Sequence, residues 1–169
     1  MSRRRVVTVV CSGNICRSPM AAAFLAAHVE QQGLGDLIEV ASAGTHALVG
    51  RAPMREAQRA VAAIRGDTSE HRGRQLDIGL ARDSDLILCA SSEHRNHILS
   101  WWPDLGAGKV RLFNENIAGS APVDVDDPYG WDQEVFDLAA RVIDRAMESW
   151  CRRLAREWST RGPAEPAAE

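Results

Sequence analysis

Residues 11–19 read CSGNICRSP and place a cysteine, Cys11, six positions before an arginine, Arg17. An arginine guanidinium can bind two phosphate oxygens at once, and a thiolate held beside a bound phosphate is an activated nucleophile. Gly13 and Asn14 are residue types that tolerate the left-handed backbone of a tight anion-binding turn. The segment therefore predicts a phosphate-binding loop in which Cys11 attacks phosphorus and Arg17 holds the phosphate.

The spacing of cysteine and arginine alone is weak evidence, because chance gives about 0.45 such pairs in a chain of this composition. Residues 89–95 contain a second pair, but that segment has no glycine and is a poor phosphate nest. Requiring the glycine, asparagine, serine and proline of the first segment lowers the chance expectation to roughly one in several hundred thousand. Cys89 and Cys151 are accordingly interpreted as buried structural thiols.

The elements on either side of the loop must position it. A β-branched run at residues 6–10 predicts a buried strand. Ser18 followed by Pro19 is typical of a helix N-cap and the first helical position, so the loop joins a strand to a helix N-terminus. Backbone N–H groups in such a turn converge on an anion, and the helix dipole adds positive charge that favours a thiolate at Cys11.

The rest of the chain alternates between strand and helix patterns. An apolar stripe on the last predicted helix comprises Val135, Leu138, Ala139, Val142, Ile143 and Ala146. Such alternation indicates βαβ units, and hence an α/β fold with a parallel sheet covered on both faces. Ligands of these folds bind beyond the carboxyl ends of the strands, which is where Cys11 falls. Further strands are predicted at residues 38–41, 85–90 and 110–113, and further helices at residues 53–64, 92–101 and 132–158.

The bulk properties of the 169-residue chain exclude several classes of protein. Its length fits one domain, predicted over residues 1–158, and the Pro-, Ala- and Glu-rich residues 159–169 are predicted to be a disordered tail. A formal net charge of −3 gives no reason to expect nucleic-acid binding. Four dispersed cysteines suit neither a disulfide scaffold nor a zinc site, and no apolar run suits a signal peptide or a membrane span. We expect a cytoplasmic protein without a bound metal.

Three later segments contain further motifs: SAGT at residues 42–45, His71 with RQL at residues 74–76, and DPY at residues 127–129. Together with the loop they resemble the low-molecular-weight protein tyrosine phosphatases, whose signature is C-x-G-N-x-C-R-S-P. The resemblance covers nearly the whole chain. It implies a three-layer, phosphatase I-like α/β fold with a four-stranded parallel sheet and no cofactor. It also implies that a phosphotyrosine-containing protein is hydrolysed through a phosphocysteine intermediate on Cys11.

The resemblance also implies roles for individual residues. Arg17 would bind the phosphate, and Ser18 would steady the thiolate with its hydroxyl. Asn14, Ser42 and His71 would form the network that holds the loop in shape. The phosphate-binding loop would comprise Ser12, Gly13, Asn14, Ile15, Cys16 and Ser18.

The reaction also benefits from a general acid, because a phenolate leaves more readily when it is protonated. Asp124, Asp126 and Asp127 are all candidates by composition. The family motif selects Asp127, which would later take a proton from the hydrolytic water. Tyr129, the only tyrosine, is predicted to wall the cleft, where a phenyl ring can stack on it.

Three other functions share parts of this pattern. Thiol-dependent arsenate reductases have nearly the same loop but use two further cysteines near each other in sequence, whereas Cys89 and Cys151 are far apart. Protein arginine phosphatases tend to have threonine where this chain has Ile15, so Ile15 favours phosphotyrosine. An inactive phosphotyrosine-binding module usually lacks the nucleophile, the arginine or the acid, and this chain keeps all three.

Two features bear on substrate preference and regulation. Residues 46–50, which help to shape the cleft rim, contain no aromatic of the Phe, Tyr or Trp type, which leaves substrate preference open. By resemblance, Cys16 would form a reversible disulfide with the nucleophile on oxidation, so the enzyme is expected to be redox-sensitive. A bacterial tyrosine kinase is the partner that family analogy suggests.

Overall fold

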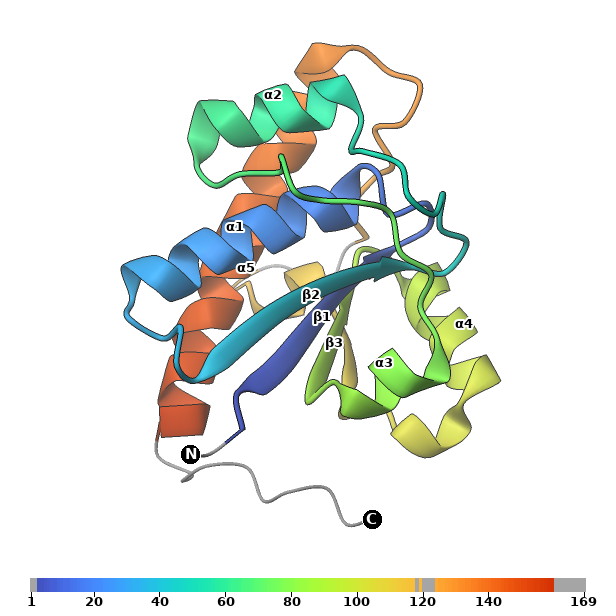
Figure 1. Cartoon of the computed structure of the whole chain (residues 1–169), viewed down its shortest axis with the longest axis vertical. Coiled ribbons are helices and arrows are strands. Elements are labelled where there is room, and N and C mark those ends of the chain that lie inside the picture. Colours follow the sequence, from blue (N-terminus) through green and yellow to red (C-terminus); the bar gives the residue numbers. More distant parts are fainter. Residues whose placement is uncertain (1–2, 118, 120–123, 160–169) are drawn as a thin grey trace.

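The computed structural model describes residues 3–117, 119 and 124–159 (Figure 1). The described residues form a four-stranded sheet in the order β2-β1-β3-β4, in which all neighbouring strands are parallel. This sheet confirms the predicted α/β fold. The strands are β1 (Arg5–Cys11), β2 (Ile38–Gly44), β3 (Leu86–Cys89) and β4 (Val110–Leu112).

β1 occupies the inside of the sheet, where both of its faces are covered. Its β-branched sequence suits this position, and Val7 and Val9 are fully buried. The register pairs Cys11 with Gly44, the last residue of β2, and β3 ends beside the same part of β1. The carboxyl ends of three strands therefore meet where Cys11 lies.

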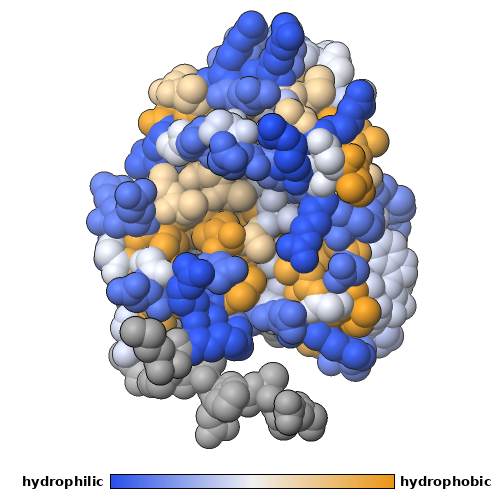
Figure 2. Space-filling model, viewed as in Figure 1, coloured by the Kyte–Doolittle hydropathy of each residue, from blue (hydrophilic) through white to orange (hydrophobic). Residues whose placement is uncertain are grey.

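Helices on both faces of the sheet complete three layers (Figure 1). Three of them pack together over one hydrophobic core, and the other two lie over a second core on the opposite face. The first group is α1 (Arg17–Gln31), α2 (Arg55–Ile64) and α5 (Gln133–Ser159), and the second is α3 (Ile78–Asp83) and α4 (Ser92–Trp101). Figure 2 shows that hydrophobic residues reach the surface over part of the first group of helices, with hydrophilic residues around them.

All of the predicted strands and helices are present, with ends that differ by a few residues, and α4 has the predicted bounds. The short helix α3 was not predicted, because six residues are too few to show a helical period. Its start is nevertheless marked by Asp77, whose Oδ1 accepts a hydrogen bond from the backbone N–H of Leu80 at 2.8 Å. Two 3-10 turns, Pro103–Leu105 and Phe113–Asn116, flank β4.

The predicted N-cap role of Ser18 is wrong. α1 begins at Arg17, the N-cap residue is Cys16, and no side chain caps the helix. The hydroxyl of Ser18 instead lies 2.9 Å from the sulfur of Cys11. The serine is thus used by the loop rather than by the helix backbone.

The predicted apolar stripe of α5 is only partly correct. Leu138 and Val142 are 52% and 42% exposed. Large aromatic side chains lie on the inward face, where the indole of Trp150 donates to the carbonyl groups of Leu112 and Phe113 at 3.2 and 2.9 Å. The buried face of the helix comprises Phe136, Ala140, Ile143, Ala146, Met147, Trp150, Cys151, Leu154 and Trp158.

Almost all of the predicted tail, residues 160–169, lies outside the described residues. Within the part that is described, none of the helices combines the length and the apolar character that a bilayer crossing requires. The same residues contain no group of three or more His, Cys, Asp or Glu side chains placed to hold a metal ion.

Candidate active site

The loop between β1 and α1 folds back sharply at Asn14, whose φ is 57°. Its carbonyl groups are bound from outside by the chain that follows β2: the backbone N–H groups of Thr45, His46 and Leu48 donate to the carbonyls of residues 11, 12 and 13 at 2.9 to 3.0 Å. This arrangement leaves the opposite, N–H side of the loop peptides facing inward, as an anion nest requires. Gly44 permits the close approach, because a Cβ there would collide with the carbonyl of residue 12.

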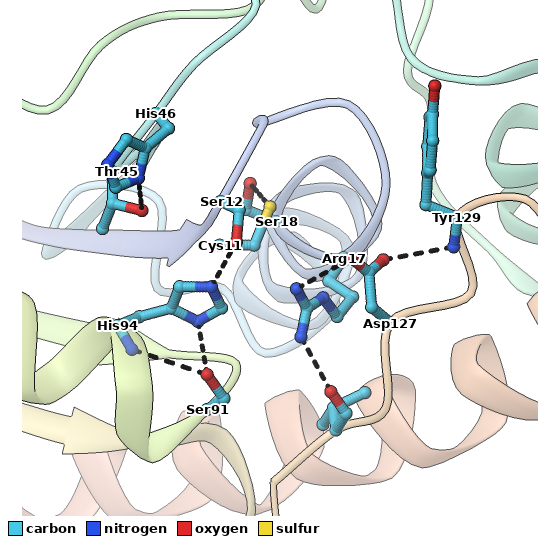
Figure 3. Close-up of polar contacts among 11 residues, drawn as sticks. Cys11, Ser12, Arg17, Ser18, Thr45, His46, Ser91, His94, Asp127 and Tyr129 are labelled. Atoms are coloured by element: carbon cyan, nitrogen blue, oxygen red, sulfur yellow. Dashed lines mark hydrogen bonds and ion pairs between the residues drawn. The ribbon is translucent and has the colours of Figure 1, made fainter.

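Cys11 lies at the start of this loop and is 2% exposed. Its sulfur is 2.9 Å from the hydroxyl oxygen of Ser18 (Figure 3). The side-chain amide of Asn14 donates to that same oxygen at 2.7 Å. Because the oxygen of Ser18 already accepts this bond, its hydrogen is available to the sulfur, where it stabilises negative charge.

A chain of polar contacts holds Asn14 in its left-handed conformation. Its Oδ1 accepts from the backbone N–H of Arg74 at 2.8 Å, and its carbonyl accepts from His71 Nε2 at 2.8 Å. Burial lowers the pKa of His71, although the hydrogen bond to the carbonyl of Asn14 opposes this shift. His71 Nδ1 lies 3.4 Å from the hydroxyl of Ser42, so the structure brings together the three residues that the family resemblance grouped.

Arg17, in the first turn of α1, is 5% exposed and lines the same cavity as Cys11. Its Nη1 donates to the carbonyl of Val125 at 2.9 Å, and its Nη2 lies 3.4 Å from Asp127 Oδ2 (Figure 3). Its Nε is buried and has no hydrogen-bond partner among the described residues. A buried guanidinium N–H without an acceptor is costly, so this side chain is suited to receive an anion.

The three candidate acids lie in different environments. Asp124 accepts from the backbone N–H and the hydroxyl of Ser92 at 2.7 and 2.9 Å, and so ties its loop to the start of α4. Asp126 lines a separate hollow beside α5. Asp127 alone of the three lines the cavity above Cys11, and its Oδ1 accepts from the backbone N–H of Tyr129 at 3.1 Å.

Cys11, Arg17 and Asp127 line a cavity of about 200 Å³. Its most exposed apolar and aromatic lining residues are Leu48 and Tyr129, at 39% and 59% exposure. Leu48 belongs to the loop that was expected to shape the rim. The lining residues are Cys11, Ser12, Gly13, Ile15, Cys16, Arg17, Leu48, Asp127 and Tyr129.

The four cysteines are all free thiols. Cys16 lines the cavity, and burial together with the nearby Cys11 raises its pKa to about 12. Burial also raises the pKa of Cys89, and that of Cys151 to about 11. The last two are buried away from the cavity lining, as the sequence predicted.

One residue of this region was missed at the level of sequence. His94, in the first turn of α4, is 2% exposed, and its Nε2 lies 2.8 Å from the hydroxyl of Ser12. Burial and, after it, the positive charge of Arg17 lower the pKa of His94 to about 4. The contact joins loop and helix across 82 positions of the chain, so no local pattern could reveal it.

Comparison with known proteins agrees with this geometry. The family model "Low molecular weight phosphotyrosine protein phosphatase" matches residues 6–160. The low molecular weight protein-tyrosine-phosphatase Etp of Escherichia coli K12 is 35% identical over 151 residues, which are 89% of this chain and 95% of Etp.

Two solved structures show the same fold at similar coverage. YwlE arginine phosphatase from Geobacillus stearothermophilus has a TM-score of 0.82 and 27% identity, over 95% of this chain and 99% of YwlE. Vibrio vulnificus Wzb in complex with benzylphosphonate has a TM-score of 0.78 and 31% identity, over 90% of this chain and 100% of Wzb. This chain therefore belongs to the low-molecular-weight protein tyrosine phosphatase family.

Proposed function

We propose that the enzyme hydrolyses phosphotyrosine in proteins, with Cys11 as nucleophile, Arg17 as phosphate ligand and Asp127 as general acid and base. The observation that carries the proposal is that Arg17 lines the same cavity as Cys11, and that its buried Nε has no acceptor among the described residues. A phosphate oxygen would supply that acceptor in a charge-assisted hydrogen bond.

In the first step, the sulfur of Cys11 forms a bond to phosphorus while the bond from phosphorus to the tyrosine oxygen breaks. Asp127 donates its proton to the departing phenolate oxygen. The position of Asp127 supports this role, because it lies against Arg17 at 3.4 Å on the wall of the cavity and remains half-exposed. A positioned acid contributes on the order of 10²–10⁴-fold to such a step.

In the second step, a water oxygen attacks phosphorus and the phosphorus–sulfur bond breaks. The Asp127 carboxylate accepts the proton of that water, and the electron pair returns to the sulfur of Cys11 as a thiolate. The hydroxyl of Ser18, 2.9 Å from the sulfur, stabilises this leaving group. Asn14, Ser42 and His71 would keep the loop rigid through both steps.

The cavity rim supports an aryl phosphate as substrate. Ile15, Leu48 and Tyr129 offer apolar and aromatic surface to a phenyl ring, whereas a guanidinium packed against these three side chains would lose hydration. A related enzyme, Vibrio vulnificus Wzb, binds the aryl-bearing benzylphosphonate. YwlE has a closely similar fold and is an arginine phosphatase, so phosphoarginine is the alternative to be tested.

We place the activity in the cytoplasm, as a single domain over residues 1–158, with phosphotyrosyl proteins such as a bacterial tyrosine kinase as substrates. The free thiols of Cys11 and Cys16, which line one cavity, suit a reducing compartment.

The test is hydrolysis of p-nitrophenyl phosphate and of matched phosphotyrosyl and phosphoarginyl peptides. Wild type should hydrolyse the phosphotyrosyl peptide faster, Cys11→Ser should abolish turnover, and Asp127→Ala should reduce kcat by about 10²-fold or more. Asp126→Ala is the matched control, because Asp126 is exposed and lies outside the cavity lining. Faster turnover of the phosphoarginyl peptide would reassign the substrate, and tight binding of vanadate without turnover would contradict the enzymatic proposal.

A further inference from the structure

A second polar chain reaches the loop from α4, and the steps proposed above do not use it. The imidazole of His94 lies between two hydroxyl groups (Figure 3): its Nε2 is 2.8 Å from the oxygen of Ser12, and its Nδ1 is 2.9 Å from the oxygen of Ser91. His94 and Ser91 are both buried, at 2% and 7% exposure, whereas Ser12 lines the cavity with Cys11.

His94 is neutral at neutral pH, because burial and the nearby guanidinium of Arg17 lower its pKa to about 4. A neutral imidazole has one N–H donor and one acceptor nitrogen. The two hydroxyl groups therefore cannot play the same role, and one must donate to the ring while the other accepts from it.

The position of Ser91 favours Nδ1 as the acceptor nitrogen. Ser91 is the N-cap residue of α4, and its oxygen already accepts from the backbone N–H of His94 at 3.5 Å. Its own hydrogen is therefore free to point to Nδ1. With Nδ1 as acceptor, the proton of the ring is on Nε2, which donates to the oxygen of Ser12.

The tautomer of His94 determines where the hydroxyl hydrogen of Ser12 points. Once its oxygen accepts from His94, its hydrogen can point into the cavity that Cys11 and Arg17 also line. In the opposite tautomer the hydroxyl of Ser12 would donate to the ring and would present only lone pairs to an anion. An anion-binding cavity favours the first arrangement.

We infer that the hydroxyl of Ser12 is a hydrogen-bond donor to the phosphoryl group, and that His94, held by Ser91, is the positioning residue that turns this hydroxyl toward it. The inference rests on the proposed phosphatase function and adds a donor to the same site. Negative charge on the phosphoryl oxygens must be stabilised in both steps, and one donor to a charged oxygen corresponds to roughly tenfold or more in binding or rate.

The test is a double-mutant cycle on kcat/KM for a phosphotyrosyl peptide. Ser12→Ala should reduce kcat/KM by roughly tenfold. His94→Asn, whose amide is too short to reach Ser12, should have a similar effect, and adding it to Ser12→Ala should cause no further loss. His94→Gln can place an amide N–H near the position of Nε2 and should restore most of the activity. Asn96→Ala, an exposed change on the same helix, is the control.

A purely structural role of His94 predicts a different pattern: the loss from His94→Asn would persist in the Ser12→Ala background, and Gln would not rescue it. Either result would overturn the inference, as would full activity of Ser12→Ala. Binding of inorganic phosphate to the same variants, measured by calorimetry, separates this question from the proposed function. If wild type binds phosphate without turnover, the phosphatase proposal fails, and the same cycle on the dissociation constant still decides whether Ser12 and His94 act together.

Discussion

Arg17 and Asp127 are in contact: Nη2 of the arginine lies 3.4 Å from Oδ2 of the aspartate, on the wall of the cavity that contains Cys11. The arginine is 5% exposed, whereas the side chain of the aspartate is half-exposed. Nη1 of Arg17 also donates to the carbonyl of Val125, two residues before the acid. The proposed phosphate ligand thus helps to position the proposed acid, and changes to the arginine should affect both.

Replacing Arg17 with lysine tests this relationship. Lysine keeps the positive charge but cannot reach the carbonyl of Val125, Asp127 and a phosphate oxygen in one planar fork. We expect kcat/KM for p-nitrophenyl phosphate to fall by about 100-fold or more. Arg82→Lys, at an exposed ion pair with Asp104, should behave as wild type. Activity of Arg17→Lys within a factor of a few of wild type would contradict the assigned role.

Asn14 should be a main determinant of loop stability. Its φ of 57° disfavours a residue with a Cβ, and its side chain makes two hydrogen bonds, to Ser18 and to the backbone of Arg74. Asn14→Ala should lower the free energy of unfolding by about 3 kcal/mol, and Asn14→Gly by about 1 kcal/mol less, because glycine removes the backbone strain. Urea denaturation measures both, with Asn96→Ala as an exposed control. Equal losses in the two variants would argue against strain at this position.

Much of this molecule can be predicted from local sequence signals. The β-branched run before Cys11 and the helical periods after it are local, and the loop from Cys11 to Arg17 is contiguous, so strand, loop and helix follow directly from the sequence. The choice among three nearby aspartates needs the fold. Asp124 bonds to Ser92 at the start of α4, whereas only Asp127 reaches the cavity, and composition alone treats the two alike.

Tertiary contacts account for a wrong prediction, the N-cap role of Ser18, and for a missed residue, His94. Ser18 follows the rules for an N-cap, but its hydroxyl contacts the sulfur of Cys11, a tertiary contact that propensities do not include. His94 reaches the loop only because parallel strands bring the start of α4 beside the end of β1. Its sequence neighbourhood gives no sign of a functional residue, since the segment from Cys89 to Arg95 lacks glycine.

The free energy of unfolding should depend on pH through His94. The folded protein binds this proton with a pKa of about 4, whereas an unfolded histidine has a pKa of about 6.5. Between these values the unfolded chain holds more protons, so stability falls as the pH is lowered from about 6.5 toward 4. Burial lowers the pKa of His71 as well, which acts in the same direction.

Urea denaturation of wild type and His94→Gln across this window isolates the contribution of His94, because the carboxylates titrate in both proteins. Wild type should lose about 1–2 kcal/mol more than the variant, after allowance for screening by solvent. Parallel losses in the two proteins would show that His94 is not held neutral by the fold.

Oxidation should be reversible only while Cys16 is present. Both Cys11 and Cys16 line the cavity, and the raised pKa of Cys16, about 12, keeps it a thiol that peroxide attacks slowly. Peroxide should therefore oxidise Cys11 to a sulfenic acid, which the thiol of Cys16 converts to a disulfide with release of water. In Cys16→Ser, excess peroxide would oxidise the sulfenic acid further to a sulfinic acid that dithiothreitol does not reduce, so dithiothreitol should restore activity to wild type but not to this variant. Cys151→Ser, which changes a buried cysteine elsewhere, should recover like wild type. Irreversible inactivation of wild type would contradict the mechanism.

Substrate preference should depend on the apolar and aromatic side chains that line the cavity. Tyr129 is 59% exposed on the rim, and Ile15 is 6% exposed at the cavity wall. Tyr129→Ala should raise KM for a phosphotyrosyl peptide by about 3- to 10-fold, the worth of one aromatic contact, whereas Tyr129→Phe should leave it unchanged. Trp131→Ala is the control, since Trp131 is 67% exposed and lies outside the cavity lining.

Ile15→Thr tests the choice between phosphotyrosine and phosphoarginine. Threonine at this position exchanges the ethyl arm of isoleucine for a hydroxyl that can bond a guanidinium, so the ratio of phosphoarginyl to phosphotyrosyl turnover should rise. The measurement is kcat/KM for both peptides, with wild type and variant compared in parallel. The folding of the variant is checked by its thermal transition. If the ratio stays constant while both activities remain high, the apolar wall formed by Ile15 does not set the substrate, and the preference must come from Leu48, Tyr129 or the peptide around the phosphorylated residue.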